Sequence, residues 1–134
     1  MKVEGLDHLV LTVKDLEAAC AFYAGVLGLE VVTFGDGRKA LALGAQQINL
    51  HEQGQELEPR AQHPTPGSAD LCFLTSTPLT EVMAHLAACG VAIIAGPVRR
   101  TGARGIIESV YLRDPDLNLI EIANCAPPDR PKHS

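Results

Sequence analysis

Positive charge is scarce in this sequence of 134 residues. Eleven lysines and arginines stand against sixteen aspartates and glutamates, which gives a formal net charge of −5. Non-specific binding of nucleic acid requires a basic surface, so this balance argues against that class of partner. The one local exception is a small basic cluster made by Arg99, Arg100 and Arg104.

Long hydrophobic runs are also missing. The longest apolar stretches are short, as at residues 91–95, so no segment is expected to span a bilayer and no membrane partner is expected. The N-terminus places Glu4 and Asp7 before any apolar stretch and lacks the hydrophobic core of a secretory signal. We therefore expect a cytoplasmic protein.

The cysteines form no recognisable pattern. They lie at positions 20, 72, 89 and 125, with no C-x-x-C and no zinc-finger spacing. Scattered thiols in a chain of intracellular character are expected to be buried small hydrophobic residues and not a disulfide framework.

What the sequence does contain is enough apolar material for a core. Hydrophobic residues make up 46%, charged residues 20%, and mean hydropathy is +0.10. This composition and length predict one folded domain and argue against disorder.

A diverged internal repeat organises the chain. An apolar strand at 7–12 precedes a helix that Asp15 is expected to cap and that ends at Gly28. A second strand at 69–74 precedes a helix that Thr77 is expected to cap and that ends at Gly90. Three pairs of landmarks share a spacing of 62 residues: His8 with Asp70, Asp15 with Thr77, and Gly28 with Gly90. One spacing shared by three landmarks indicates two copies of one module.

Strand patterns follow each helix. They cover residues 29–34, 39–43 and 47–52 in the first half, and residues 91–95, 106–113 and 118–123 in the second. Each half therefore reads β-α-β-β-β, which predicts an α+β fold. We place one domain at 1–125, with module one at about 4–53, a polar linker at 54–67, module two at about 68–124, and a tail at 126–134 that is expected to fray.

The two halves differ in length. If the last strands are equivalent, His51 and Glu121 are 70 residues apart, which implies eight extra residues in the second half. The best place for them is 98–105, a basic segment with glycines. This segment could be an anion-binding lid or a solvated hairpin tip, and both interpretations remain open.

Four polar residues lie in strands that are otherwise apolar. The first and last strands of the two halves supply His8 with His51, and Asp70 with Glu121. Imidazoles and carboxylates that converge from such strands would suit a divalent metal such as Zn, Mn, Fe, Co or Ni. Asp70 is the least certain member, because it could instead cap its strand or bind backbone. Asn49 shares a strand face with His51.

The stretches DHLVLTVKDLEAACAFYAGVLGLEVV, INLHE and RDPDLNLIEI resemble the vicinal oxygen chelate superfamily. This group contains glyoxalase I, fosfomycin and bleomycin resistance proteins, and extradiol dioxygenases. The resemblance covers residues 4–124 and is strongest to small glyoxalase-domain proteins of the lactoylglutathione lyase type. It implies paired βαβββ modules that form an open, mixed, cup-shaped sheet around a metal.

The resemblance also implies roles for individual residues. It places metal ligands at His8 and Glu121, and His51 lies on a strand that supplies a ligand in many members, with Asn49 as the competing position. Asp70 stands where a histidine is common. Leu117 replaces the glycine that is usual in D-P-D-G-N, which should alter the turn only.

The resulting hypothesis is a metal-dependent, glyoxalase-like lyase or isomerase. Its small substrate would chelate the metal through oxygen atoms and react through an enediolate-type intermediate. His8, His51 and Glu121 would hold the metal, Asp70 would be a fourth ligand or base, and Glu121 or Asp70 would move the proton. Asn49 and Arg100 would bind substrate. A homodimer is expected from the resemblance.

Three alternatives remain open from the sequence. Two histidines and one carboxylate also suit the non-haem iron of a dioxygenase. A non-catalytic protein that binds an antibiotic or toxin is possible on the same scaffold, as is thiol transfer of the fosfomycin-resistance type.

Overall fold

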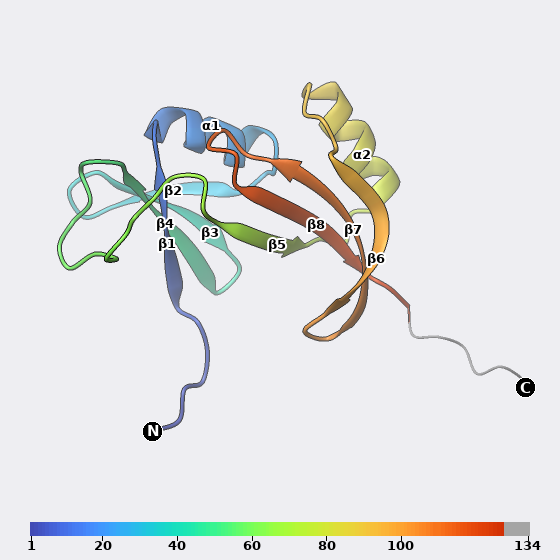
Figure 1. The fold of residues 1–134 in the computed structure, drawn as a ribbon, viewed down its shortest axis with the longest axis horizontal. Coiled ribbons are helices and arrows are strands. Elements are labelled where there is room, and N and C mark those ends of the chain that lie inside the picture. Colours follow the sequence, from blue (N-terminus) through green and yellow to red (C-terminus); the bar gives the residue numbers. More distant parts are fainter. Residues whose placement is uncertain (128–134) are drawn as a thin grey trace, which may run out of the picture. The chain divides into compact units, whose positions relative to one another are not determined.

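The computed structural model describes residues 1–127, which form two units of four strands and one helix each (Figure 1). Unit 1 comprises Met1–Ala69 together with Asp114–Asn118, and unit 2 comprises Asp70–Arg113 and the chain from Leu119. Each unit has the order β-α-β-β-β, which confirms the α+β fold and the repeat predicted from the sequence. The tail that was expected to fray lies largely outside the described residues.

Unit 1 is a four-stranded sheet in the order β1-β4-β3-β2, with β1 parallel to β4 and the other pairs antiparallel. Helix α1 follows β1, and the parallel partner β4 comes later in the chain. The elements are β1 (His8–Val13), α1 (Leu16–Gly25), β2 (Glu30–Phe34), β3 (Arg38–Leu43) and β4 (Gln46–Glu52).

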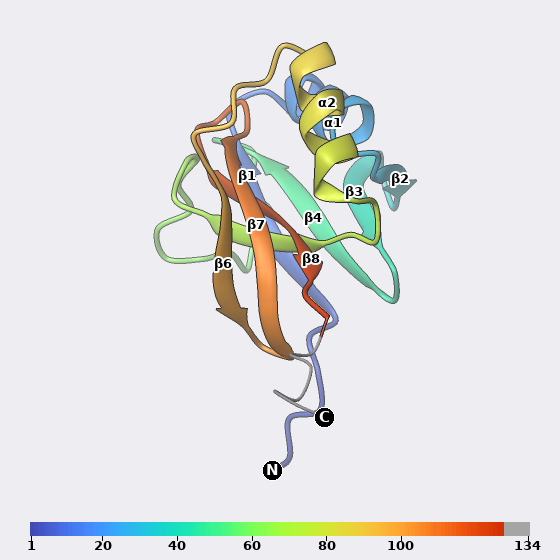
Figure 2. The ribbon, with the colours of Figure 1, turned by 90° about the vertical axis from the view of Figure 1, so that its right-hand side faces the viewer.

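Unit 2 repeats this arrangement with the order β5-β8-β7-β6, and β5 is parallel to β8. Strands β6, β7 and β8 run side by side (Figure 2). The elements are β5 (Asp70–Leu74), α2 (Leu79–Ala88), β6 (Ala95–Gly102), β7 (Gly105–Arg113) and β8 (Leu119–Cys125).

Each helix packs against its own sheet and buries one face of it. In unit 1, α1 contacts β2 and β4, and in unit 2, α2 contacts β7. The buried apolar side chains of the helix-facing sides are Leu11, Val13, Leu41, Ile48 and Leu50 in unit 1, and Val110, Leu112, Ile120 and Ile122 in unit 2. Because side chains alternate along a strand, the polar residues predicted to be functional project from the opposite face.

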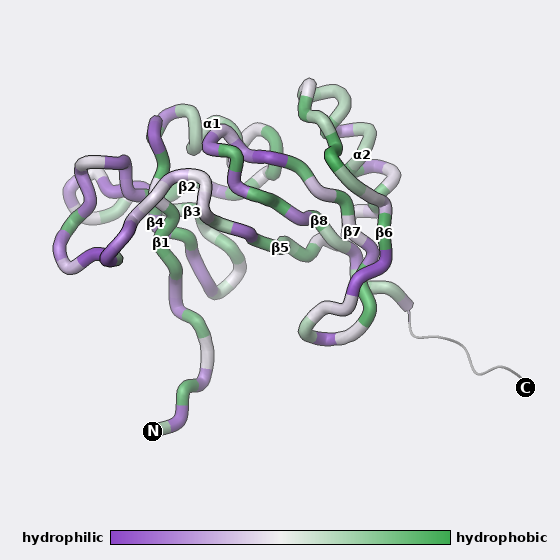
Figure 3. Tube along the Cα trace, in the orientation of Figure 1, coloured by the Kyte–Doolittle hydropathy of each residue, from purple (hydrophilic) through white to green (hydrophobic). Residues whose placement is uncertain are grey.

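The segment between β4 and β5, which contains the predicted linker and belongs to unit 1, is polar as its composition predicted. Figure 3 shows mostly hydrophilic and neutral residues along the segment from β4 to β5, in contrast to the apolar strands. No helix in the described part of the chain is long and apolar enough to cross a membrane.

The two helices begin differently. Asp15 caps α1 as predicted, because its Oδ1 accepts a hydrogen bond from the Ala18 amide at 3.1 Å. The prediction that Thr77 caps α2 is wrong. The Oδ1 of Asn124 accepts instead from the Leu79 amide at 3.0 Å, so a side chain of β8 replaces the local cap.

Residues 91–95 were expected to form a strand, and this is wrong except at Ala95. The strand is β6, whose residues Val98–Gly102 pair with Gly105–Ser109 of β7. Most of the segment 98–105, which was expected to be an inserted loop, is therefore hydrogen-bonded β-strand. A tight hairpin turn follows Gly102. Backbone pairing with β7 outweighs the apolar character of 91–94.

The cysteines are free, but they are not the buried residues that were expected. Cys20 is half-buried, and Cys72, Cys89 and Cys125 are exposed. Cys72 and Cys125 lie on the strand face opposite to the helix, and Cys89 lies at the end of α2. The alternation of the strands, which composition does not reveal, accounts for the difference.

A buried carboxylate organises the turn between β7 and β8. Asp114 is only 3% exposed, and its side chain accepts hydrogen bonds from the Tyr23 hydroxyl at 2.6 Å and from the amides of Asp116 and Asn118, both at 2.9 Å. The side-chain amide of Asn118 adds a fourth bond at 2.8 Å. The carboxylate is thereby fully used as an acceptor.

The same turn binds two other segments of unit 1. The Oδ1 of Asp116 accepts from the Lys14 amide at 3.1 Å, and the Oδ1 of Asn118 accepts from the Ala69 amide at 2.8 Å. The D-P-D-x-N motif therefore joins the end of β1, helix α1 and the end of the linker. Its polar residues therefore have a structural role.

We expect Asp114→Ala to lower the free energy of unfolding by about 3 kcal/mol or more, because several buried donors lose a charged acceptor. Urea denaturation measures the change. Asp36→Ala, at an exposed turn position, is the matched control and should change stability by less than about 0.5 kcal/mol. Equal effects of the two substitutions would contradict the role of Asp114.

Unfolding at alkaline pH tests how much the buried, protonated hydroxyl of Tyr23 contributes to stability. Burial raises the pKa of Tyr23 well above its ordinary value of 10.0, and the hydrogen bond to Asp114 and the nearby carboxylates raise it further. The unfolded chain ionises near pH 10 while the folded chain does not, so this contribution is complete below pH 10 and lost above it. We expect wild-type stability to fall above pH 10 by about 1.4 kcal/mol per pH unit more than that of Tyr23→Phe. Parallel slopes in urea denaturation would contradict the assignment.

Leu117 is the one described residue other than glycine with a positive φ, at 70°. Its side chain is 69% exposed, so little packing offsets the strain. We expect Leu117→Gly to stabilise the protein by about 0.5–1 kcal/mol, because glycine adopts this conformation without a steric penalty. Thermal unfolding measures the effect, and a lower melting temperature would show that Leu117 packing matters more than strain.

Candidate metal centre

In unit 1 the two predicted histidines lie on neighbouring strands. His8 is opposite Gln47 and His51 is opposite Thr12 in the parallel β1–β4 pair, so the two histidines project from the same face. They are four positions apart along the strands, about 13 Å at the usual rise per residue. The His8 side chain is 44% exposed, and its Nδ1 lies 2.8 Å from Oδ2 of Asp7.

Asn49, the competing position on β4, lies opposite Val10 and only two positions from the level of His8. It is buried, and its Oδ1 accepts a hydrogen bond from Nε2 of Gln47 at 2.7 Å. Asn49 and His51 therefore share the face of His8, with Asn49 closer along the strand.

His51 has an unsatisfied buried atom. Its Nε2 has no hydrogen-bond partner among the described residues. The side chain lines a cavity of about 480 Å³ in unit 1, together with Thr12 and linker residues that include Glu56 and Arg60. A buried imidazole nitrogen without a partner is uncommon in a folded protein and calls for an explanation.

Glu56 adds negative charge beside this cavity. Both of its carboxylate oxygens lie 3.1 Å from the Gly54 amide, and Arg60 lies 3.6 Å away. Hydrogen bonds from the backbone amides of Glu56 and Gly54 are the main cause of its lowered pKa, and the charges of Arg60 and His51 lower it further. Glu56 is therefore ionised at neutral pH.

In unit 2, Glu121 lies on the central strand β8. Its neighbours across the sheet are Cys72 on β5 and Tyr111 on β7. The Oε2 atom of Glu121 is buried and has no hydrogen-bond partner in the described chain. Asp70 projects from the same face, two positions before Cys72, and is exposed.

Cys72 is a site residue that sequence reasoning missed, because it was counted as a small core residue. Although Cys72 is exposed as a residue, partial burial of its thiol raises the pKa of that thiol to about 11, with further contributions from the charge of Glu121, a hydrogen bond to Glu121, and the charge of Asp70. Cys72 is therefore protonated at neutral pH in this structure. Its alternation with Asp70 and Leu74 was the signal that could have placed it on the polar face.

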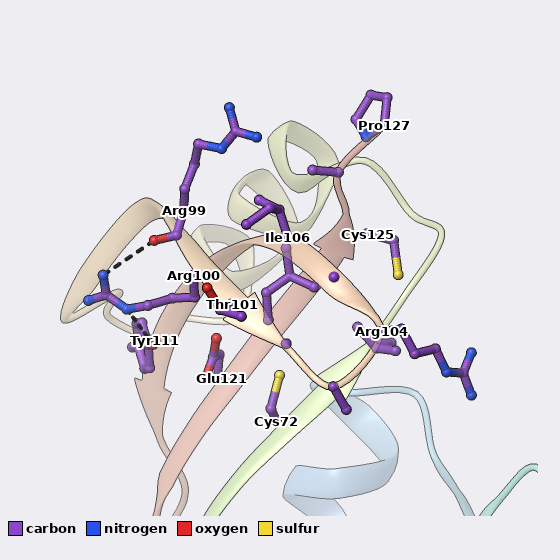
Figure 4. A pocket seen from close by; sticks show the side chains of 16 residues that line it. Cys72, Arg99, Arg100, Thr101, Arg104, Ile106, Tyr111, Glu121, Cys125 and Pro127 are labelled. Atoms are coloured by element: carbon purple, nitrogen blue, oxygen red, sulfur yellow. Dashed lines mark hydrogen bonds between the residues drawn. The ribbon is translucent and has the colours of Figure 1, made fainter. Parts of the chain in front are cut away.

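A second cavity, of about 770 Å³, opens on this face of unit 2 (Figure 4). Glu121, Cys72, Tyr111 and Arg100 line it. Arg100 extends toward Tyr111, and its Nε donates a hydrogen bond to the phenol oxygen at 3.2 Å. Arg100, predicted to bind substrate, thus lines the same cavity as Glu121.

The strand registers correct one detail of the repeat. His8 is opposite Gln47, and its equivalent Asp70 is opposite Leu119. Two positions further along each strand, Glu121 is therefore equivalent to Asn49. The expected equivalence of Glu121 with His51 is wrong. The extra residues of β6 and its hairpin tip make simple counting along the chain unreliable here.

In the part of the chain that the structure describes, no group of three or more His, Cys, Asp or Glu side chains is gathered so that it could hold a metal ion. The structure does not bring His8 and His51 together, because they lie about 13 Å apart along neighbouring strands, whereas Asp70 lies two positions from Glu121. The ligand set as a whole stays a prediction.

Comparisons with known proteins agree with the fold. Virulence protein STM3117 of Salmonella typhimurium is 57% identical over 123 residues, which are 92% of this chain and 85% of that protein. Its crystal structure matches with a TM-score of 0.91 and 56% identity, covering 94% of this chain and all of that chain (100%). Glyoxalase domain-containing protein RDO1 of Mycosarcoma maydis is 50% identical, over 92% of this chain and 70% of that protein.

A more distant solved structure carries an enzyme name. Lactoylglutathione lyase of Agrobacterium tumefaciens is 25% identical, with a TM-score of 0.69 over 92% of this chain and 95% of that chain. The family model that matches residues 5–122 describes glyoxalase, bleomycin resistance protein and dioxygenase together. With nearly the whole chain matched, the protein belongs to the glyoxalase/bleomycin resistance protein/dioxygenase superfamily.

Proposed function

We propose that the protein is a metal-dependent lyase or isomerase of the glyoxalase type. His8, His51 and Glu121 bind a divalent metal (Zn, Ni, Mn, Co or Fe), with Asp70 as a fourth ligand or as a base. One observation carries the proposal: Nε2 of His51 and Oε2 of Glu121 are buried without hydrogen-bond partners. Leaving such atoms unsatisfied costs about 1–3 kcal/mol each, and a bound cation would offset that cost.

The donor set fits such a metal chemically. Imidazole nitrogen and carboxylate oxygen are ligands of zinc and of the neighbouring transition metals. Only three side-chain N or O atoms in the described chain are buried without partners, and two of them belong to residues chosen from the sequence as ligands.

The two carboxylates suit different roles. The buried Oε2 of Glu121 supports its role as a ligand, whereas the exposed Asp70 can exchange protons with solvent and suits a base. A bound divalent metal would supply Lewis-acid polarisation of the substrate oxygens. Asp70 takes the proton next to the carbonyl and returns it to the neighbouring carbon, Asn49 hydrogen-bonds a substrate oxygen, and Arg100 holds an anionic group.

A dioxygenase is the second candidate. His8, His51 and Glu121 are two histidines and one carboxylate, the set that binds non-haem iron in oxygenases. The superfamily model names dioxygenases as well as glyoxalases. The relative named lactoylglutathione lyase, at 25% identity over 92% of this chain, favours the lyase.

We further propose a homodimer in the cytoplasm. Val10, Leu57 and Ile94 are large apolar residues between 46% and 49% exposed, which supports a second copy as partner. Four free cysteines suit a reducing compartment. Analytical ultracentrifugation tests the dimer, and a monomer at micromolar concentration would contradict it.

We expect His8→Ala and Glu121→Gln to lower the metal content of the purified protein by more than about tenfold, because each removes a direct ligand. Elemental analysis after dialysis measures the metal-to-protein ratio. His85→Ala, on helix α2, is the matched control and should keep the wild-type ratio. Full metal content in both ligand variants would sink the assignment, and a metal-free wild type would favour a non-catalytic binding protein.

The variant Asp70→Asn distinguishes the role of Asp70 as a base from its role as a metal ligand. As a base, Asp70 contributes about 10²–10⁴-fold to the rate, so its loss should lower turnover of a hemithioacetal by that factor while metal content is retained. Loss of metal together with activity would make Asp70 a ligand. Oxygen uptake with catechol in place of hemithioacetal turnover would establish the dioxygenase.

A further inference from the structure

The cavity of unit 2 contains an arginine held in a fixed position. Arg100 donates from Nε to the Tyr111 hydroxyl at 3.2 Å and from Nη1 to the carbonyl oxygen of Arg99 at 3.4 Å, as Figure 4 shows. The guanidinium carbon lies 5.8 Å from the centre of the Tyr111 ring. These bonds use two of the five guanidinium N–H donors and leave the others for a ligand.

The strand register places this arginine toward Glu121. Arg100 is opposite Ile107, and Ile107, Ser109 and Tyr111 alternate along one face of β7. Arg100 therefore runs along this face to reach Tyr111, whose neighbour on β8 is Glu121. Side chains at such opposed positions are about 5 Å apart at Cβ. Arg100, Tyr111 and Glu121 therefore line one cavity.

The lining of the cavity is basic and apolar. Arg99, Arg100 and Arg104 line it, and Glu121 is the one acidic residue in the lining. This excess of positive charge in a protein of net charge −5 attracts anions to this cavity. Leu74 and Ile106, which are 50% and 41% exposed, add apolar surface to the same lining.

We propose that the unit 2 cavity binds an amphipathic organic anion, a carboxylate or phosphonate with an apolar chain. Arg100 binds the charged group, and Tyr111 is a positioning residue that fixes the guanidinium. The apolar chain contacts Leu74 and Ile106. The assignment of this anion as the substrate rests on the proposed function, because Glu121, the metal ligand proposed there, lines the same cavity as Arg100.

Nuclear magnetic resonance titration of ¹⁵N-labelled, full-length protein tests the proposal with three probes of one chain length. Hexanoate and hexylphosphonate carry the two oxyanions, and hexanamide is the neutral match. We expect an oxyanion to bind at least about tenfold more tightly than hexanamide, because hydrogen bonds between charged partners are the stronger ones. The better of the two probes identifies the oxyanion.

Two variants separate the roles of the pair. Arg100→Gln should lose the preference for the oxyanion. Tyr111→Phe should keep that preference, weaken binding severalfold, and lose the slowly exchanging Nε–H signal of Arg100. Arg38→Gln is the matched control, because Arg38 stacks on Phe34 at 4.6 Å in unit 1 and should leave binding unchanged.

Equal binding of hexanoate, hexylphosphonate and hexanamide, or wild-type binding by Arg100→Gln, would overturn the proposal. An unchanged Nε–H signal and affinity in Tyr111→Phe would overturn the positioning role. The same titration with metal-free and metal-supplemented protein keeps the two hypotheses apart. Anion binding by a protein that takes up no metal overturns the proposed function alone, and metal uptake without anion binding overturns this inference alone.

Discussion

The buried carboxylate of Asp114 is the interaction on which the arrangement of unit 1 depends. It accepts the hydroxyl of Tyr23 from α1 and the amides of its own turn, and the turn in turn holds the ends of β1 and of the linker. A charge so deeply buried is tolerated only because every bond is made. Along the chain, this turn also connects β7 to β8, the strand of Glu121.

Strand register then decides which side chains can cooperate. In each unit the first strand is parallel to the last, so polar residues of both strands project from the face that the helix leaves open. Asp70 and Glu121 are two positions apart in this register, whereas His8 and His51 are four apart. His51 and Glu121 each have a buried polar atom without a hydrogen-bond partner in the described chain. Such atoms are uncommon in folded proteins, and a bound ligand would supply the missing partner.

The fold was predictable from the sequence because its signals are local and occur twice. Helix periodicity, the Asp15 cap and the shared spacing of 62 residues are all properties of short segments. The errors concern long-range pairing: the cap of α2 comes from Asn124, and β6 forms from a basic segment because β7 lies beside it. Cys72 and Tyr111 were missed for the same reason, since only the register shows them beside Glu121.

The central proposal is that the unpaired buried atoms of His51 and of Glu121 are metal ligands. X-ray absorption spectroscopy of the zinc-loaded protein tests it most directly, because outer-shell scattering counts imidazole ligands. The account predicts two imidazoles at about 2.0–2.1 Å with carboxylate oxygen at a similar distance, and one imidazole fewer in His51→Ala. A first shell of oxygen alone, or an identical spectrum in His51→Ala, would contradict it.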